Sequence, residues 1–302
     1  MKRGWITWDK KEIPPTSFEK RLNTAKDYLA KRDLDALVVY TDIWKSNQGR
    51  YFSNFMPYWN RALLVIPREG APVLLCGLSP RVYPWIRSVT ILEEIRPGAN
   101  LVQMLQQLCA EKGWARVGAL DLPQFPADLS IPNGVDVPWL AVHPTPDESE
   151  LLMYRRAAKM AREILEAEMP FGMGMTDHDF IGRLELKFRR AGAEDLVILT
   201  TNGDTPPLPP TGAKLGDSFS AAVALEYRGH WVKVARCLAG LADAPKESKI
   251  ELLSGPYPYE YCSRADLNDG ALFAVFDEYR ERGKRLFSGD SWRQAPEKAD
   301  LL

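Results

Sequence analysis

The residues with the most distinctive chemistry lie in one stretch, KLGDSFSAAVALEYRGHWVKVAR, which runs from Lys214 to Arg236. Its first half is rich in β-branched, aromatic and small apolar residues, Arg228-Gly229 suits a tight connection, and the second half alternates again, which predicts a β-hairpin. Hairpins of this kind often present carboxylates to a metal ion. Here the inward positions carry alanines and a lysine, Lys233, and Arg236 follows on the same strand. The stretch therefore offers cationic groups where metal ligands would be expected.

The first part of the chain is predicted to contain alternating helices and strands. Ser17 to Lys31 has apolar residues at helical spacing, and DALVVY, RALLVIP and APVLLCG are short apolar runs typical of strands. A helix from Leu101 to Lys112 and a strand in VGALDL follow. Helices and strands in this order predict an α/β layered domain over residues 1–145.

A second domain is predicted over residues 146–302, because prolines cluster just before it. Asp147 to Met169 is a long amphipathic pattern, and Thr176 with Asp179 is close to a capping box that begins a helix ending near Arg190. After these helices the chain is mostly strands, which makes this domain α+β. The predicted strands are Leu196–Thr201, the two strands of the hairpin, Ala271–Tyr279 and Arg285–Arg293.

Composition excludes several classes of function. A net charge of -1 gives no basic face for nucleic acid, and no apolar run reaches membrane-spanning length. The first residues are too polar for a secretory signal, and the sequence has no Ser-His-Asp arrangement, GxSxG elbow or glycine-rich phosphate loop. The 4 cysteines are far apart and form no CxxC pair, which indicates reduced structural thiols in a cytoplasmic protein.

Three stretches in this order resemble the creatinase/prolidase/aminopeptidase P family. NQGRYFSNF resembles part of the family's N-terminal domain, and ESELLMYRRAAKMAREI followed by GMTDHD resembles the helices that open its C-terminal "pita-bread" domain. The hairpin resembles the central frame of that domain, with a GD dipeptide before its first strand and an arginine at the end of its second. The resemblance implies a creatinase-like α/β domain followed by a shortened α+β pita-bread domain.

The resemblance also implies where metal ligands would stand. The family's peptidases hold two metal ions with two aspartates, a histidine and two glutamates. The aspartate positions fall on Ala222 and Lys233, the glutamate positions fall on Phe276 and Gly289, and the histidine segment is largely missing. Methyl, ammonium, phenyl and hydrogen side chains cannot coordinate a divalent cation, and an ammonium repels one. We therefore expect no metal site of this kind and no cofactor.

Lys233 is the candidate catalytic group in place of the metals, together with Arg236. An ammonium at a former cation site would stabilise developing negative charge or bind a substrate carboxylate, and a desolvated lysine has a lowered pKa and can act as a base or nucleophile. Creatinase, in the same family, cleaves its substrate without a metal. The structural alternative is that Lys233 forms an ion pair with Asp290 or Glu226 and fills the old site.

Residues of both domains are candidates for binding a substrate. They are Arg50, Arg61, Tyr51, Trp59, His230 and Asp290. Strand alternation places His230 and Lys233 on opposite faces, which favours a surface or interface role for His230. The N-terminal residues belong to an aromatic and cationic run that suits a dimer interface or a pocket for a flat substrate. In creatinase-like enzymes this region lies at the dimer interface.

Two functions remain open from the sequence. The first is a cytoplasmic, metal-independent enzyme that cleaves a small polar or aromatic acid by hydrolysis or a lyase-type reaction. The second is an inactive pseudopeptidase that serves as a binding or assembly subunit. The segment from Leu238 to Leu267 is too short to form the second helix pair of a pita-bread domain. Without those helices, the strands Ala224–Tyr227 and Ala271–Phe276 would expose apolar side chains to water. We therefore expect a homodimer or a heteromeric partner that covers them. No nucleic-acid or membrane partner is expected.

Overall fold

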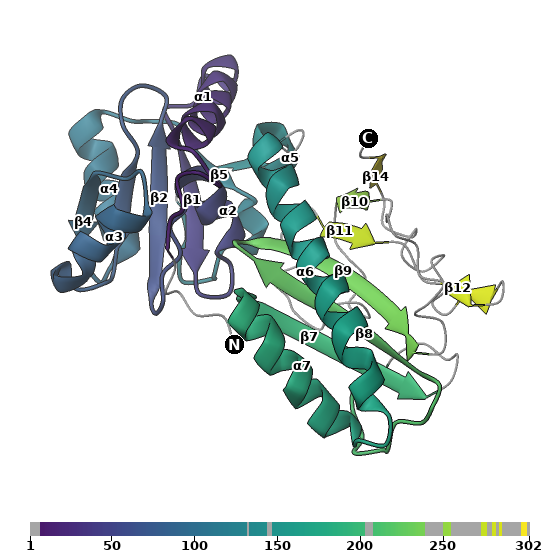
Figure 1. The fold of residues 1–302 in the computed structure, drawn as a ribbon. Coiled ribbons are helices and arrows are strands. Elements are labelled where there is room, and N and C mark those ends of the chain that lie inside the picture. Colours follow the sequence, from purple (N-terminus) through teal and green to yellow (C-terminus); the bar gives the residue numbers. More distant parts are fainter. Residues whose placement is uncertain are drawn as a thin grey trace. The chain divides into compact units, whose positions relative to one another are not determined.

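The computed structural model describes residues 7–131, 133–143, 147–202 and 208–238, followed by short strand segments at 250–254, 273–276, 280–281, 284–285 and 297–300. The side chains of Lys233, Ala235, Cys237 and the later segments lie outside this description. The chain divides into two compact units, Lys2–Ser149 and Glu150–Leu302, whose elements are labelled in Figure 1.

The first unit is built on a sheet with the strand order β4-β3-β2-β1-β5-β6. β2 is antiparallel to both of its neighbours, and the other neighbouring strands are parallel to each other. Its helices and strands are α1 (Pro15–Arg32), β1 (Ala36–Asp42), α2 (Asn47–Ser53), β2 (Arg61–Pro67), β3 (Val73–Cys76), η1 (Pro80–Val82), α3 (Tyr83–Val89), β4 (Glu94–Pro97), α4 (Leu101–Lys112), β5 (Val117–Leu120), η2 (Leu122–Gln124), β6 (Val135–Val137) and α5 (Trp139–Val142).

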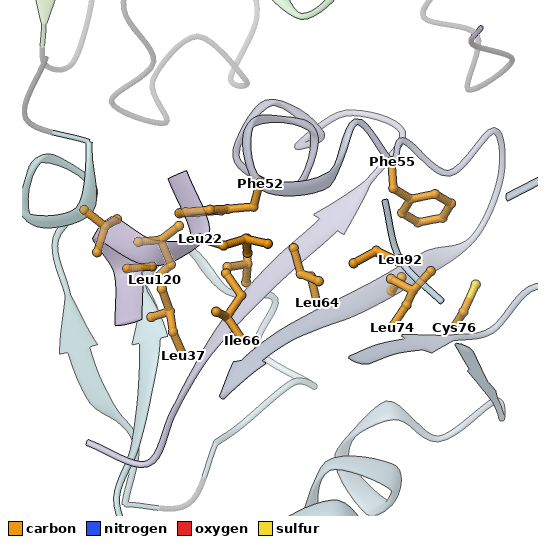
Figure 2. Packing of buried hydrophobic residues seen from close by; sticks show 14 of the residues in the cluster. Leu22, Leu37, Phe52, Phe55, Leu64, Ile66, Leu74, Cys76, Leu92 and Leu120 are labelled. Atoms are coloured by element: carbon orange, nitrogen blue, oxygen red, sulfur yellow. The ribbon is translucent and has the colours of Figure 1, made fainter. Parts of the chain in front are cut away.

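Both faces of this sheet are covered by helices, because β1 contributes alternate residues to two cores. Leu37 and Val39 pack with residues of α1, α2 and α3, whereas Val38 packs with residues of α4. Figure 2 shows the first of these cores, in which Phe52 of α2 meets leucines of the strands. The first unit is therefore a three-layer α/β domain, as predicted.

Two cysteines of this unit are free thiols. Cys76 is buried in the core, and burial raises its pKa to about 11. Burial also raises the pKa of Cys109. Thiols with raised pKa values are poor nucleophiles at neutral pH, which argues against a nucleophilic role for these two side chains.

The second unit contains a sheet with the strand order β14-β10-β11-β9-β8-β7, and β12 and β13 pair separately. The elements of this second unit, including the helix that leads into it, are α6 (Glu148–Gly172), α7 (Asp177–Ala191), β7 (Asp195–Asn202), β8 (Phe219–Tyr227), β9 (His230–Cys237), β10 (Ile250–Ser254), β11 (Phe273–Phe276), β12 (Arg280–Glu281), β13 (Lys284–Arg285) and β14 (Glu297–Asp300). No helix in the described part of either unit is long and apolar enough to cross a membrane.

The helices α6 and α7 lie along the strands β7, β8 and β9, as Figure 1 shows. Their apolar faces form one core with the sheet, to which Leu165 and Phe180 contribute from the helices and Val223 and Val234 from the strands. The predicted cap of α7 is present, since Thr176 Oγ1 accepts a hydrogen bond from the Asp179 N–H at 3.1 Å. The two helices therefore cover one face of β8 and β9.

The central hairpin is also present as predicted. Arg228 and Gly229 have φ angles of 49° and 85°, the left-handed values that a two-residue hairpin turn of type I′ requires. The register pairs Tyr227 with His230 at the turn and Ser220 with Cys237 at the far end. This register determines which residues of β8 and β9 share a face.

The exposure that we expected on β8 does not occur. Ala224 is 2% exposed and Leu225 is 0% exposed, so this strand does not offer an apolar surface to a second subunit. The side chains of Ala271–Phe276, the other strand of that argument, lie outside the described residues. Association with a second subunit stays a prediction, and of the two strands that motivated it only Ala271–Phe276 still supports it.

A pH-dependent contribution to stability is expected at the start of α7. The buried Asp177 carboxylate accepts hydrogen bonds from the N–H groups of Thr211 at 2.7 Å and Gly212 at 2.8 Å. Burial raises the pKa of Asp177, but these hydrogen bonds outweigh it and the pKa is lowered overall. Since the folded pKa is the lower one, this stabilisation is complete above the unfolded value of about 4 and is lost as the pH falls through the folded pKa.

Asp177→Asn should therefore destabilise the protein at neutral pH, and its difference from the wild type should shrink below about pH 4. Urea unfolding at a series of pH values measures this difference. Asp217→Asn is the control, because Asp217 is exposed. A difference for Asp177→Asn that is the same at every pH would contradict the assignment.

Candidate functional site

The two faces of the β8–β9 hairpin have different surroundings. Val223 and Leu225 of β8 and Val234 of β9 pack into the core formed with α6 and α7. Alternation puts Ala222 and Ala224 on the other face, where both are buried but belong to no part of that core. This second face carries the positions that resemble metal-ligand positions.

The hairpin register brings two of these positions together. Ala222 pairs with Ala235, and Ala224 pairs with Lys233, so positions 222 and 233 are diagonal neighbours on the same face. Side chains at such positions are within reach of each other when they are long. The geometry suits two ligands of one centre, but the residue at position 222 has only a methyl group.

The third position, Phe276, lies on β11, which runs parallel to β9. The β9–β11 ladder pairs position 233 with Val275, the residue before Phe276. Neither Val275 nor Phe276 has a metal-ligand atom in its side chain. Gly289 and Asp290 lie outside the described residues.

The described side chains do not fit a metal centre. Among them, no group of three or more His, Cys, Asp or Glu residues is arranged to hold an ion. Divalent metals of this class need several converging oxygen or imidazole ligands. In the part of the site that the structure describes, this donor set is missing.

Arg236 lies on the helix-covered face. It pairs with Ala221, is 1% exposed, and its Nε donates a hydrogen bond to Glu166 Oε1 of α6 at 3.0 Å. Strand alternation separates it from position 233. The structure therefore does not bring the two predicted catalytic residues together, and Arg236 takes part in an ion pair between helix and sheet.

His230 also contacts α6. Its Nδ1 lies 3.0 Å from the Arg228 carbonyl oxygen, and its Nε2 lies 3.9 Å from Glu150 Oε1. The Tyr154 ring packs edge-on against the imidazole with 5.0 Å between ring centroids. His230 is thus on the face opposite to position 233, as alternation predicted, and its neighbours belong to its own unit.

In the first unit, two of the predicted substrate-binding residues pack against the core: Arg50 is buried and Tyr51 is half-buried. Arg50 is 4% exposed, and its Nη1 lies 4.0 Å from Met56 Sδ. Tyr51 stacks edge-on against Trp139, and its carbonyl oxygen accepts a hydrogen bond from Arg21 Nη1 at 2.8 Å. Both residues have contacts typical of a domain core.

The other two lie at the surface near the start of β2. Trp59 is 67% exposed. Arg61 donates two hydrogen bonds from its guanidinium to the Asp128 carboxylate, at 2.9 and 2.6 Å, and this hydrogen bonding is the main reason that the pKa of Asp128 is lowered. Arg61 is therefore already paired with a carboxylate, and Trp59 is the most accessible of the four candidates.

Two further buried residues lie on the second face of the hairpin; our sequence analysis considered Glu226 only as an ion-pair partner of Lys233 and did not consider Trp231. Glu226 is 0% exposed and pairs with Trp231, which is 1% exposed. Glu226 is the other diagonal neighbour of position 233 on β8. This position is consistent with the ion pair between Lys233 and Glu226 that the sequence analysis gave as the structural alternative.

Comparison with known proteins identifies the fold. No protein-family model and no curated protein matches the chain. Among solved structures, an X-Pro aminopeptidase from Thermotoga maritima matches with a TM-score of 0.58 and 14% identity over 72% of this chain and 64% of that one. A prolidase from Pyrococcus horikoshii matches with a TM-score of 0.59 and 13% identity over 72% and 64%.

A Xaa-Pro dipeptidase from Bacillus anthracis is similar to the same degree, with a TM-score of 0.58 and 14% identity over 73% of this chain and 64% of that one. The chain thus spans slightly less than two thirds of the length of these structures. The likeness is one of fold, and it agrees with the resemblance found in the sequence. Over most of its length, this chain has the fold of the prolidases and aminopeptidases P.

Proposed function

We propose that the chain is a metal-independent protein of the prolidase fold that binds a small polar or aromatic acid and cleaves it by hydrolysis or a lyase-type reaction. The observation that supports this most is the hairpin register, which makes Lys233 a diagonal neighbour of Ala222 on the face away from α6 and α7. A cation at position 233 suits an anionic substrate, and the methyl group of Ala222 leaves no carboxylate to bind a metal beside it.

In this mechanism Lys233 acts through its charge. Its ammonium would bind the substrate carboxylate or stabilise the negative charge that develops on the reacting oxygen. Arg236 is not assigned a catalytic role, because its guanidinium is paired with Glu166 in the core. Trp59 and Arg61 belong to the first unit and are not assigned to this site.

The second candidate function is a pseudopeptidase that binds a partner. It is favoured by the burial of Ala222 and Ala224, each 2% exposed, on the face where a substrate would have to enter. A panel of small carboxylates, guanidines and amides in thermal-shift and turnover assays separates the two. Cleavage of any member supports the enzyme, whereas no binding and no turnover across the panel contradicts it.

The proposal predicts that the purified protein carries no stoichiometric zinc, manganese, cobalt or iron. Position 222 offers a methyl group and position 233 an ammonium, so two of the ligands are replaced by groups that do not coordinate. Elemental analysis should find well below one ion per chain, and a chelator should leave the melting temperature unchanged. One or more tightly bound ions per chain would show that other residues supply the ligands.

A further inference from the structure

Several polar side chains between β1 and α2 are buried without a partner among the residues that the structure describes. Thr41 and Ser46 are both 0% exposed, and neither the Thr41 Oγ1 nor the Ser46 Oγ has a hydrogen-bond partner there. Asn47 is half-buried as a residue, but both polar atoms of its side chain are buried and have no hydrogen-bond partner there either. Buried polar groups are nearly always hydrogen-bonded in native proteins, so three such neighbours call for an explanation.

The local backbone keeps these groups close together. Asp42 Oδ1 accepts hydrogen bonds from the N–H groups of Trp44 and Lys45, both at 2.6 Å, and this closes a tight turn between Thr41 and Ser46. Gly49 in the first turn of α2 lies against Thr41, because a Cβ at position 49 would be 2.9 Å from Thr41 Oγ1. The Thr41 hydroxyl therefore lies directly beside the first turn of α2.

The position in the sheet is one where α/β proteins place ligands. The chain leaves β1 towards β2 on one side, and it leaves β5 towards β6 on the other, so the carboxyl ends of β1 and β5 flank a topological switch point. Gln48 of α2 spans this point, since its Nε2 donates a hydrogen bond to Asp121 Oδ2 at 2.6 Å just after β5.

The chemistry of the three side chains decides what they would bind. Two hydroxyls and an amide are neutral, and each can both donate and accept hydrogen bonds. A cation is disfavoured because the carboxylate of Asp42, the residue after Thr41, already accepts hydrogen bonds from Tyr40 Oη at 2.6 Å and from two backbone N–H groups. An anion is disfavoured because the carboxylates of Asp42 and Asp121 belong to the same strand ends.

We propose that Thr41, Ser46 and Asn47 form a small binding site for a neutral hydrogen-bonding molecule, which is either ordered water or a small compound with a hydroxyl or amide group. Proteins contain roughly one buried water per 27 residues, usually bound to polar groups that lack other partners. This bound molecule, called the guest below, would hold α2, which carries Arg50 and Tyr51, against the end of β1. This inference does not depend on catalysis by Lys233.

Stability measurements on the full chain test whether the hydroxyls share a guest. Thr41→Val and Ser46→Ala should each lower the melting temperature, by about 2–4 °C, because each removes a hydrogen bond to the guest. The double variant should lose less than the sum of the two, since both act on the same molecule. Thr24→Val is the matched control, because the Thr24 hydroxyl is exposed and already bonds the Lys20 carbonyl oxygen. Unchanged or raised melting temperatures in the two test variants would overturn the proposal.

A crystal structure that resolves ordered solvent identifies the guest. Density for a water or a small neutral molecule is expected at about 2.7–3.2 Å from at least two of the three side chains. Single peaks identify water, and a larger feature identifies a bound compound. A metal ion, an anion or an empty site in that density would contradict the assignment.

Discussion

Lys233→Met is expected to lower turnover by about a hundredfold or more while the protein remains folded. Removing one preorganised electrostatic group from a catalytic site typically has an effect of this size. Methionine keeps an unbranched chain of similar length and removes the charge, so the substitution isolates the ammonium. The position is in the middle of β9, between β8 and β11 in the sheet, where the backbone is held on both sides.

The measurement compares turnover and melting temperature for wild type, Lys233→Met and Lys214→Met. Lys214 is exposed in the same unit and supplies an equal change of charge away from the hairpin face. Full activity of Lys233→Met would remove Lys233 from the mechanism. A large loss of stability with unchanged turnover would instead support an ion pair with Glu226, the buried carboxylate on the neighbouring strand.

The regular elements could be predicted from sequence because their patterns are local. The helix Leu101–Lys112 and the strand Arg61–Pro67 coincide with the predicted segments, and Arg228-Gly229 forms the predicted turn. The short elements β4 and β6 were missed, since β4 has only four residues and β6 only three, too few to show a period. They pair at the two edges of a sheet whose inner strands, β3, β2, β1 and β5, were each predicted as strands.

The site was less predictable because it depends on contacts between distant residues. Alternation places Arg236 and Lys233 on opposite faces, but sequence resemblance led us to treat them as one pair. The partner of Arg236, Glu166, is 70 residues away on α6, and nothing in the local sequence of either residue indicates that they meet. The burial of Arg50 and the half-burial of Tyr51 against the core likewise follow from tertiary contacts with Met56 and Trp139.

Glu166→Ala is expected to lower the free energy of unfolding by about 3 kcal/mol, because it takes a carboxylate away from a buried guanidinium. Arg236 is 1% exposed, so it cannot turn to water in the folded state. The side chain of Glu166 is 36% exposed, and this partial contact with water places the expected loss at the lower end of the range for broken buried ion pairs.

Arg236→Met should lower the free energy of unfolding by less than Glu166→Ala does, because the remaining Glu166 carboxylate can be hydrated and methionine fills much of the volume of arginine. The double variant should then be more stable than Glu166→Ala alone, which is the mark of an ion pair whose main role is mutual neutralisation. Glu163→Ala is the control on the same helix, since its pair with Lys159 is exposed and should contribute at most about 1 kcal/mol. Urea unfolding of the wild type and these four variants measures the differences. If Arg236→Met kept full stability but lost ligand binding, Arg236 would belong to the site after all, and the helix-covered face of the sheet would have to be part of the pocket.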